Sequence, residues 1–206
     1  MRTAKIFQPK DAEGLGEFIR QQPLASLVSC IENDFEATQL PLLAELDLEG
    51  NVVELIGHMA RSNRHVEMIE QNPRAIAVFL GAHGHISPSW MRDRTQAPTW
   101  NFETAHFVVD VSFVQTQDET AEAVARLLDA MEDGRPNRWH SSELGPRYDQ
   151  LIKHIVGFRA KVIDARIKFK LGQNEREDVY ADILSGLEGI GQSGLADAMR
   201  RQNVDR

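Results

Sequence analysis

The stretch GHISPSWMRDRTQAPTWNFETAHF, residues 84–107, contains several residue types that are rare in this chain. It holds two of the three tryptophans, two prolines and two histidines. The prolines restrict the backbone of the loop between Trp90 and Trp100, so its side chains are presented at low entropic cost. One interpretation is that Trp100 covers a planar ring whose polar edge bonds Thr99 and Asn101. The other is that both tryptophans bury their rings in the core.

Outward from this stretch, apolar patterning predicts more strands than helices. Strands are expected at residues 24–31, 35–46, 51–60, 74–82, 101–116 and 154–170, and helices at 11–22, 61–72, 118–132, 175–187 and 193–201. Strands do not alternate regularly with helices, so we predict an α+β, mainly β fold: an antiparallel barrel with peripheral helices rather than a doubly wound parallel sheet. Pro41 should place its strand at a sheet edge or bulge.

The helix over residues 118–132 has the clearest pattern. Asp118 and Thr120 offer capping groups at its start. Its inner stripe is expected to contain Ala121, Val124, Leu127, Leu128 and Met131.

Composition excludes several classes of function. The net charge is −8 and the pI about 5.4, and no block of Lys and Arg stands out, so direct DNA binding is not expected. No run approaches the ~20 apolar residues of a membrane span, and the N-terminus lacks the apolar core of a secretory signal. We therefore expect a cytoplasmic protein. The single cysteine, Cys30, lies in the apolar run LASLVSCI and is expected to be a buried thiol.

The stretch GHMARSN, residues 57–63, lies where a predicted strand meets a predicted helix. Unpaired backbone N–H groups at a helix start attract anions. His58, Arg61, Ser62 and Asn63 add donors, and Arg61 can grip a phosphate with two N–H groups. The alternative is helix capping by Ser62 or Asn63 beside a surface arginine.

The stretch KFKLGQN, residues 168–174, ends the last predicted strand. Lys170 could meet a phosphate, and Gln173 and Asn174 could bond the amide edge of a ring. The alternative is a solvated strand end with a helix N-cap at Asn174.

The histidines do not predict a metal site. His83 and His85 share a strand face, with His58 and His106 as further candidates, but no carboxylate or cysteine ligand accompanies them at a known spacing. No catalytic triad, Cys–His pair or carboxylate pair stands out either, so any redox chemistry has to come from a bound cofactor.

In order along the chain, ATQLPLL, GHMARSN, HISPSW, APTWNF, IVGF and KFKLGQN give a sequence that resembles the PaiB family, described as FMN-binding negative transcriptional regulators. The resemblance implies a split β-barrel of the FMN-binding type that forms a homodimer with flavin sites at the subunit interface. It implies FMN as the cofactor. By motif, His58, Arg61, Ser62 and Asn63 would surround the phosphate. Thr99, Trp100, Asn101, Lys170, Gln173 and Asn174 would lie near the ring or line the interface.

The likeness covers nearly the whole chain, so we expect one domain over residues 1–206 with a helical extension at about 175–206. Departures from the family pattern occur at Gln39, Ala82, His85, Phe102 and Gly172, and several of them remove a hydrogen-bonding group. The loss of one neutral hydrogen bond costs only about 0.5–1.5 kcal/mol, so one such change need not abolish flavin binding.

The resemblance implies a negative regulator of transcription. The acidic chain favours action through a protein partner or a flavin-sensing step over direct contact with an operator. Two other functions stay open: a flavin-dependent oxidoreductase using NAD(P)H, and a haem-binding or haem-degrading barrel protein, the latter motivated by the four histidines above.

Overall fold

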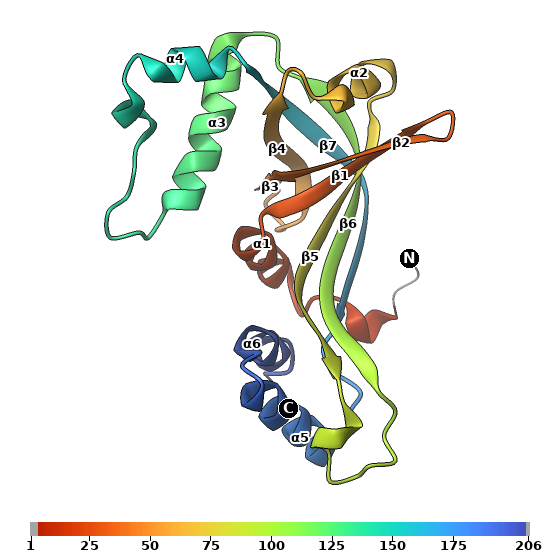
Figure 1. The fold of residues 1–206 in the computed structure, drawn as a ribbon. Coiled ribbons are helices and arrows are strands. Elements are labelled where there is room, and N and C mark those ends of the chain that lie inside the picture. Colours follow the sequence, from red (N-terminus) through yellow and green to blue (C-terminus); the bar gives the residue numbers. More distant parts are fainter. Residues whose placement is uncertain (1–3, 205–206) are drawn as a thin grey trace. The chain divides into compact units, whose positions relative to one another are not determined.

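A computed structural model of the chain describes residues 4–204. Its main feature is one seven-stranded sheet with the order β2-β1-β5-β6-β7-β4-β3, and the fold is α+β, mainly β, as predicted (Figure 1). The strands are β1 (Leu24–Ile31), β2 (Asp34–Pro41), β3 (Leu43–Leu46), β4 (Val52–Ala60), β5 (Arg74–Ile86), β6 (Thr99–Phe113) and β7 (Ile155–Lys170). The strand β2 is an edge strand that ends at Pro41, which agrees with the expectation for that proline.

Helices fill the connections and the C-terminal part of the chain. They are η1 (Lys5–Phe7), α1 (Ala12–Gln21), α2 (Arg64–Gln71), η2 (Pro88–Trp90), α3 (Gln117–Glu132), η3 (Ser141–Leu144), α4 (Arg147–Ile152), α5 (Glu177–Gly189) and α6 (Ser193–Gln202). Among residues 4–204, no helix is long and apolar enough to cross a membrane.

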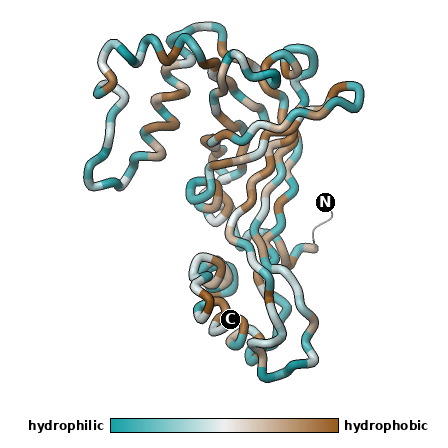
Figure 2. Tube along the Cα trace, in the orientation of Figure 1, coloured by the Kyte–Doolittle hydropathy of each residue, from teal (hydrophilic) through white to brown (hydrophobic). Residues whose placement is uncertain are grey.

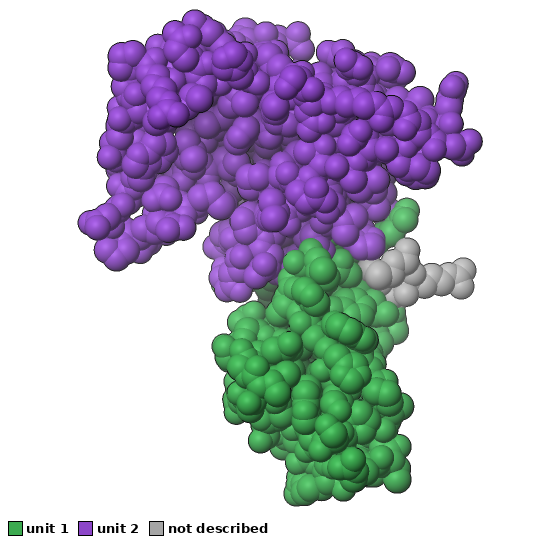
Figure 3. Space-filling model, viewed as in Figure 1, with its two compact units in different colours: residues 1–14, 80–105, 166–206 green, residues 15–79, 106–165 purple. Residues whose placement is uncertain are grey.

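The chain divides into two compact units (Figure 3). Unit 1 comprises Met1–Gly14, Leu80–Ala105 and Arg166–Arg206, and unit 2 comprises Leu15–Phe79 and His106–Ala165. The strands β5, β6 and β7 contribute residues to both units.

Aromatic packing organises the core of unit 2. The Phe79 ring is fully buried and lies edge-on to Phe107, with centroids 5.8 Å apart, and to Phe18 of α1, with centroids 6.5 Å apart. Edge-to-face pairs of this kind add stability beyond the area they bury. Leu15 and Ile19 lie on the same helical stripe as Phe18, which is why α1 buries one face.

The helix α3 starts one residue earlier than predicted and is capped differently. Thr116 accepts a hydrogen bond from the Glu119 N–H, and the Glu119 carboxylate accepts one from the Thr116 N–H, so the pair forms a capping box in place of Asp118 and Thr120. Polar and apolar positions alternate along this helix (Figure 2). Its buried face consists of Thr120, Ala123, Val124 and Leu127; Ala121, Leu128 and Met131 are only half-buried.

Three local predictions are corrected by the structure. The helix after β4 begins at Arg64 rather than near residue 61, because Asn63 is its N-cap. The strand β5 continues to Ile86 instead of ending at 82. Cys30 is exposed, not buried: inward and outward positions alternate along β1, and Cys30 falls on the outward side.

Candidate functional site

The junction between β4 and α2 gives Asn63 the capping role foreseen as an alternative. The Asn63 Oδ1 accepts a hydrogen bond of 2.9 Å from the His65 N–H, and its Nδ2 donates to Thr38 Oγ1 over 3.1 Å. Both ends of this amide are therefore committed within the protein. A phosphate at this junction would be met by Arg61 and Ser62, whose side chains are exposed.

Behind this junction lies a buried hydrogen-bond network around His65, which is fully buried. Its Nδ1 lies 3.0 Å from Thr38 Oγ1 and its Nε2 lies 2.9 Å from Ser29 Oγ. Because Asn63 already donates to Thr38, the Thr38 hydroxyl can donate to Nδ1, which leaves the Nε2–H to donate to Ser29. Burial lowers the pKa of His65, so the neutral imidazole that this network needs is favoured.

His58 of unit 2 has a buried ring nitrogen without a hydrogen-bond partner in the described part of the chain. It lies on β4 opposite Gly157 of β7. Its Nδ1 is buried and, among the side-chain atoms of residues 4–204, stands out as a buried polar atom without a hydrogen-bond partner. Burial also lowers its pKa. An unpartnered buried nitrogen costs stability, so a role toward a ligand would explain why it is there.

The two tryptophans of the quoted stretch have different environments. A Cβ on Gly186 of α5 would lie only 2.4–2.6 Å from atoms of the Trp90 ring, so this indole packs directly on the helix backbone. Trp100 is 54% exposed and meets the exposed His85 edge-on, with ring centroids 6.0 Å apart. Trp90 is half-buried against α5, whereas the Trp100 ring is mostly exposed.

Lys170 is fixed beside Trp100. Its ammonium donates hydrogen bonds to Thr99 Oγ1 and, over 3.0 Å, to the carbonyl of Trp100. Burial is the main cause that lowers the pKa of Lys170, and the neighbouring Lys168 charge lowers it further. Thr99, Trp100 and Lys170 thus form one polar and aromatic group in unit 1.

Two of the amide side chains predicted to bond the ring edge have partners within the protein. Gln173 accepts a hydrogen bond of 2.7 Å from the Leu171 N–H and donates to the carbonyl of Phe169. Asn101 is 2% exposed and directs its amide toward the sulfur of Met199 on α6. A ring contact from either residue requires these arrangements to change. Asn174 is exposed, and the following helix is capped at Arg176 instead.

Ion pairs hold the loop between the two tryptophans. Arg92 donates to Asp182 of α5 from its backbone N–H and from its guanidinium, at 2.8 and 3.0 Å. Arg176 pairs with Asp93 at 2.9 Å. Hydrogen bonds from Thr95, then from Arg176, hold the pKa of Asp93 well below its usual range. The first residues of the loop, Arg92 and Asp93, are therefore fastened to α5 and to the residue before it.

The structure shows the surroundings of three departures from the family pattern. Gly172 has φ of +79°, a conformation that favours glycine, and a Cβ there would approach Met199. Phe102 lies against the ammonium of Lys168. The Ala82 N–H, which a proline would lack, donates to Glu103 over 3.2 Å. Glu103 is 6% exposed, and burial raises its pKa.

The predicted site residues fall into two groups. His58, Arg61, Ser62 and Asn63 belong to unit 2, and Thr99, Trp100, Asn101, Lys170, Gln173 and Asn174 belong to unit 1. Sequence reasoning missed Ser29, Thr38 and Glu103. Ser29 and Thr38 give no local signal, since they lie far from His65 in the chain. Glu103 is visible in the sequence as one of two carboxylates in the largely apolar strand β6. No group of three or more metal-binding side chains occurs within the described residues.

Comparison with known proteins gives a consistent result. A family model described as "Putative FMN-binding domain" matches residues 1–164. The Bacillus subtilis protein "Protease synthase and sporulation protein PAI 2" is 30% identical over 189 residues, which cover 91% of this chain and 89% of that protein.

Two solved structures share the fold at low sequence identity. The flavocytochrome Anf3 from Azotobacter vinelandii aligns with a TM-score of 0.61 and 15% identity, over 83% of this chain and 73% of that one. The FAD and heme binding protein from Mycobacterium smegmatis aligns with a TM-score of 0.60 and 16% identity, over 87% and 80%. Together with the sheet order, these likenesses identify the fold as the split barrel.

Proposed function

The chain belongs to the PaiB family, and from that premise we propose that it binds flavin in the form of FMN. The structural observation that carries the proposal is the unpartnered, buried Nδ1 of His58, which lies on β4 just before the exposed Arg61. An anion at the β4–α2 junction would give both groups a partner. Of the flavins, FMN offers a terminal phosphate of this kind.

In this proposal each residue of unit 2 has a defined task. Arg61 grips the phosphate through two N–H groups, which is the geometry that guanidinium matches best. Ser62 adds a hydroxyl donor. His58, whose pKa is lowered by burial, acts as a neutral donor rather than as a cation. Asn63 accepts the His65 N–H and so holds the start of α2 in place, next to Arg61 and Ser62.

The residues of unit 1 serve the ring. The exposed Trp100 indole covers a flat heterocycle, and the hydrogen bonds from Lys170 fix the backbone on which the indole is carried. Thr99 and Lys170 offer polar atoms to the ring edge. Bound flavin would supply electron-transfer chemistry that no side chain here provides. Asn101, Gln173 and Asn174 complete the predicted set.

We also propose that the protein is a homodimer with the flavin site at the subunit interface. The support in unit 1 is the exposure of two large apolar side chains on strands, Leu80 of β5 at 52% and Trp100 of β6 at 54%. Burial of such surface against a second copy is favourable. Light scattering of the purified protein tests this: a single species of twice the chain mass is expected.

The biological role that we propose is negative regulation of transcription through a protein partner or a flavin-sensing step. The net charge of −8 supports an indirect route, because tight contact with phosphate backbones needs clustered cations. Tight, salt-sensitive and sequence-selective binding in a gel-shift titration would contradict it. Steady consumption of NAD(P)H with added FMN would instead favour the oxidoreductase alternative.

The flavin proposal is tested by titrating FMN and riboflavin into wild type, Arg61→Ala and Arg147→Ala. Arg147 is an exposed arginine of α4 and serves as the matched control. A charge-assisted hydrogen bond contributes about 1.5–3 kcal/mol, so Arg61→Ala should weaken FMN by about tenfold to a hundredfold. Riboflavin has no phosphate and should be affected less than about twofold. Equal weakening of both flavins would show that Arg61 does not hold the phosphate.

A further inference from the structure

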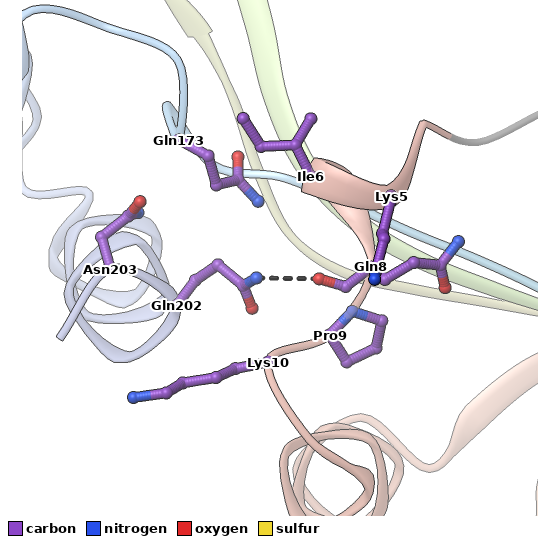
Figure 4. Close-up of a pocket in the computed structure, with 8 residues that line it drawn as sticks. All are labelled: Lys5, Ile6, Gln8, Pro9, Lys10, Gln173, Gln202 and Asn203. Carbon is purple, nitrogen blue, oxygen red and sulfur yellow. Dashed lines mark hydrogen bonds between the residues drawn. The ribbon is translucent and has the colours of Figure 1, made fainter. Parts of the chain in front are cut away.

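The structure contains a cavity in unit 1 that shares only Gln173 with the proposed flavin contacts. Its volume is about 510 Å³, which is within the range of small-molecule sites. Three parts of the chain form its two walls (Figure 4). One is the N-terminal segment with Lys5, Ile6, Gln8, Pro9 and Lys10, and the other consists of Gln173 and the end of α6 with Gln202 and Asn203.

The charge of the cavity is opposite to that of the chain. Two lysines and no carboxylate line it, whereas the whole chain carries a net charge of −8. Lys5 is exposed and makes no ion pair with any described residue. A cavity lined by cations alone in an acidic protein favours an anionic occupant.

The amide side chains of the cavity wall offer acceptors for uncharged polar groups of a ligand. Asn203 donates its amide hydrogens to the carbonyls of Leu171 and Met199, at 3.1 and 2.8 Å, and Gln202 donates to the carbonyl of Gln8 over 2.8 Å. These bonds use both amide N–H groups of Asn203 and one of the two of Gln202, and they leave the two carboxamide oxygens as acceptors. Such oxygens suit hydroxyl or amino groups on a ligand.

The N-terminal wall is fastened to the sheet by an aromatic clamp. The ammonium of Lys168 on β7 lies 5.6 Å from the ring centroid of Phe7 and 5.6 Å from that of Phe102. A cation held between two rings is stabilised by both. Phe7 follows Lys5 and Ile6 in η1, so the clamp fixes the helix that presents Lys5 to the cavity.

We propose that this cavity binds a small organic anion whose head group is a phosphate monoester or a carboxylate. Lys5 is the charged partner of the head group, and the oxygens of Gln202 and Asn203 accept from the polar groups of the ligand. Lys168 is a positioning residue that acts through Phe7. The proposal makes no use of Arg61 or Trp100, so it stands apart from flavin binding.

The test is calorimetric titration of the full-length protein at low ionic strength with AMP, citrate and adenosine. AMP tests binding of a phosphate head group, and citrate tests binding of a carboxylate. Adenosine, which lacks the phosphate of AMP, is the uncharged control. At least one of the two anions should bind, and adenosine should not. Lys5→Gln should lower the affinity for that anion by about tenfold, because one charge-assisted hydrogen bond is lost. Lys161→Gln changes an exposed lysine of β7 and should leave binding unchanged.

Lys168→Met tests the clamp. It leaves Lys5 in place but removes the cation between the rings, so it should weaken the anion by about threefold to tenfold. Circular dichroism and a melting curve establish that each variant is folded. Failure of both anions to bind wild type, or equal weakening by Lys5→Gln and Lys161→Gln, would overturn the proposal.

Two further titrations separate this cavity from the flavin site. Arg61→Ala should not change binding of the anion, and Lys5→Gln should not change binding of FMN. Loss of the anion in Arg61→Ala with retention in Lys5→Gln would place the anion elsewhere and refute the cavity assignment. Failure of FMN to bind any variant would refute the flavin proposal and leave the result for the anion standing.

Discussion

Lys170 on β7 donates a hydrogen bond of 3.0 Å to the backbone carbonyl of Trp100 on β6. The same ammonium bonds Thr99 Oγ1. The lysine therefore links the end of the last strand to the residue whose indole is exposed. This one contact joins two of the sequence motifs, APTWNF and KFKLGQN, which lie far apart in the chain.

Replacement of this lysine should loosen the Trp100 backbone. Lys170→Met removes both hydrogen bonds, and both acceptors can turn to water, so the free energy of unfolding should fall by only about 1 kcal/mol. Tryptophan fluorescence should become more accessible to quenching by acrylamide, a neutral quencher that the loss of the lysine charge does not affect. Lys161→Met is the control, and urea denaturation measures stability. No change in quenching relative to this control would contradict the link.

Gly186 should be intolerant of a side chain. A Cβ there would lie 2.4–2.6 Å from atoms of the Trp90 ring, so Gly186→Ala should lower the free energy of unfolding by about 1–3 kcal/mol through overpacking. Gly189 in the same helix has open space around its Cβ position. Gly189→Ala should stay within about 1 kcal/mol of wild type. Equal effects of the two variants in thermal melts would refute the packing of Trp90 on α5.

Stability should fall in mild acid because of two histidines. Burial lowers the pKa of His58 and His65 below 6.5, so the unfolded chain binds more protons than the folded one in the window below that pH. The contribution of the two neutral histidines to the free energy of unfolding is fully present above pH 6.5 and is lost as the pH falls through their pKa values in the folded protein. Urea denaturation between pH 5 and 8 should show this slope.

The slope should be smaller in His58→Asn, which cannot titrate. His140→Asn is the control, since His140 is exposed. A slope in His58→Asn that matches wild type would mean that His58 does not contribute to the acid sensitivity.

Glu103 should give the opposite pH dependence. Burial raises its pKa above 4.5, so its contribution to stability is present below 4.5 and is lost as the pH rises through the folded value. Glu103→Gln keeps an acceptor for the Ala82 N–H and removes the buried charge. It should raise the melting temperature at pH 7.5 and lose that advantage near pH 4.5. Glu122→Gln replaces an exposed glutamate and serves as the control, which should show no such trend. A lower melting temperature for Glu103→Gln at pH 7.5 would show that the buried charge of Glu103 does not destabilise the fold.

The sequence by itself determined the order and type of the main elements. Strand and helix patterns arise from the local spacing of apolar residues, which is why the positions of β1, β4, β7, α1, α5 and α6 were predicted within a few residues. The ordered motifs also determined the family. Element ends were less well predicted, as at α2, because Asn63 and Ser62 are both good caps and only one can be used.

Only the tertiary structure decided which side of each strand is covered and which polar group is already satisfied. Trp90 and Trp100 look alike in sequence, yet one packs on Gly186 and the other is exposed, because the helix that covers Trp90 lies much later in the chain. Asn63 and Gln173 likewise read as ligand donors until their partners are known. Burial and hydrogen bonding depend on neighbours distant in sequence, and a local pattern does not identify those neighbours.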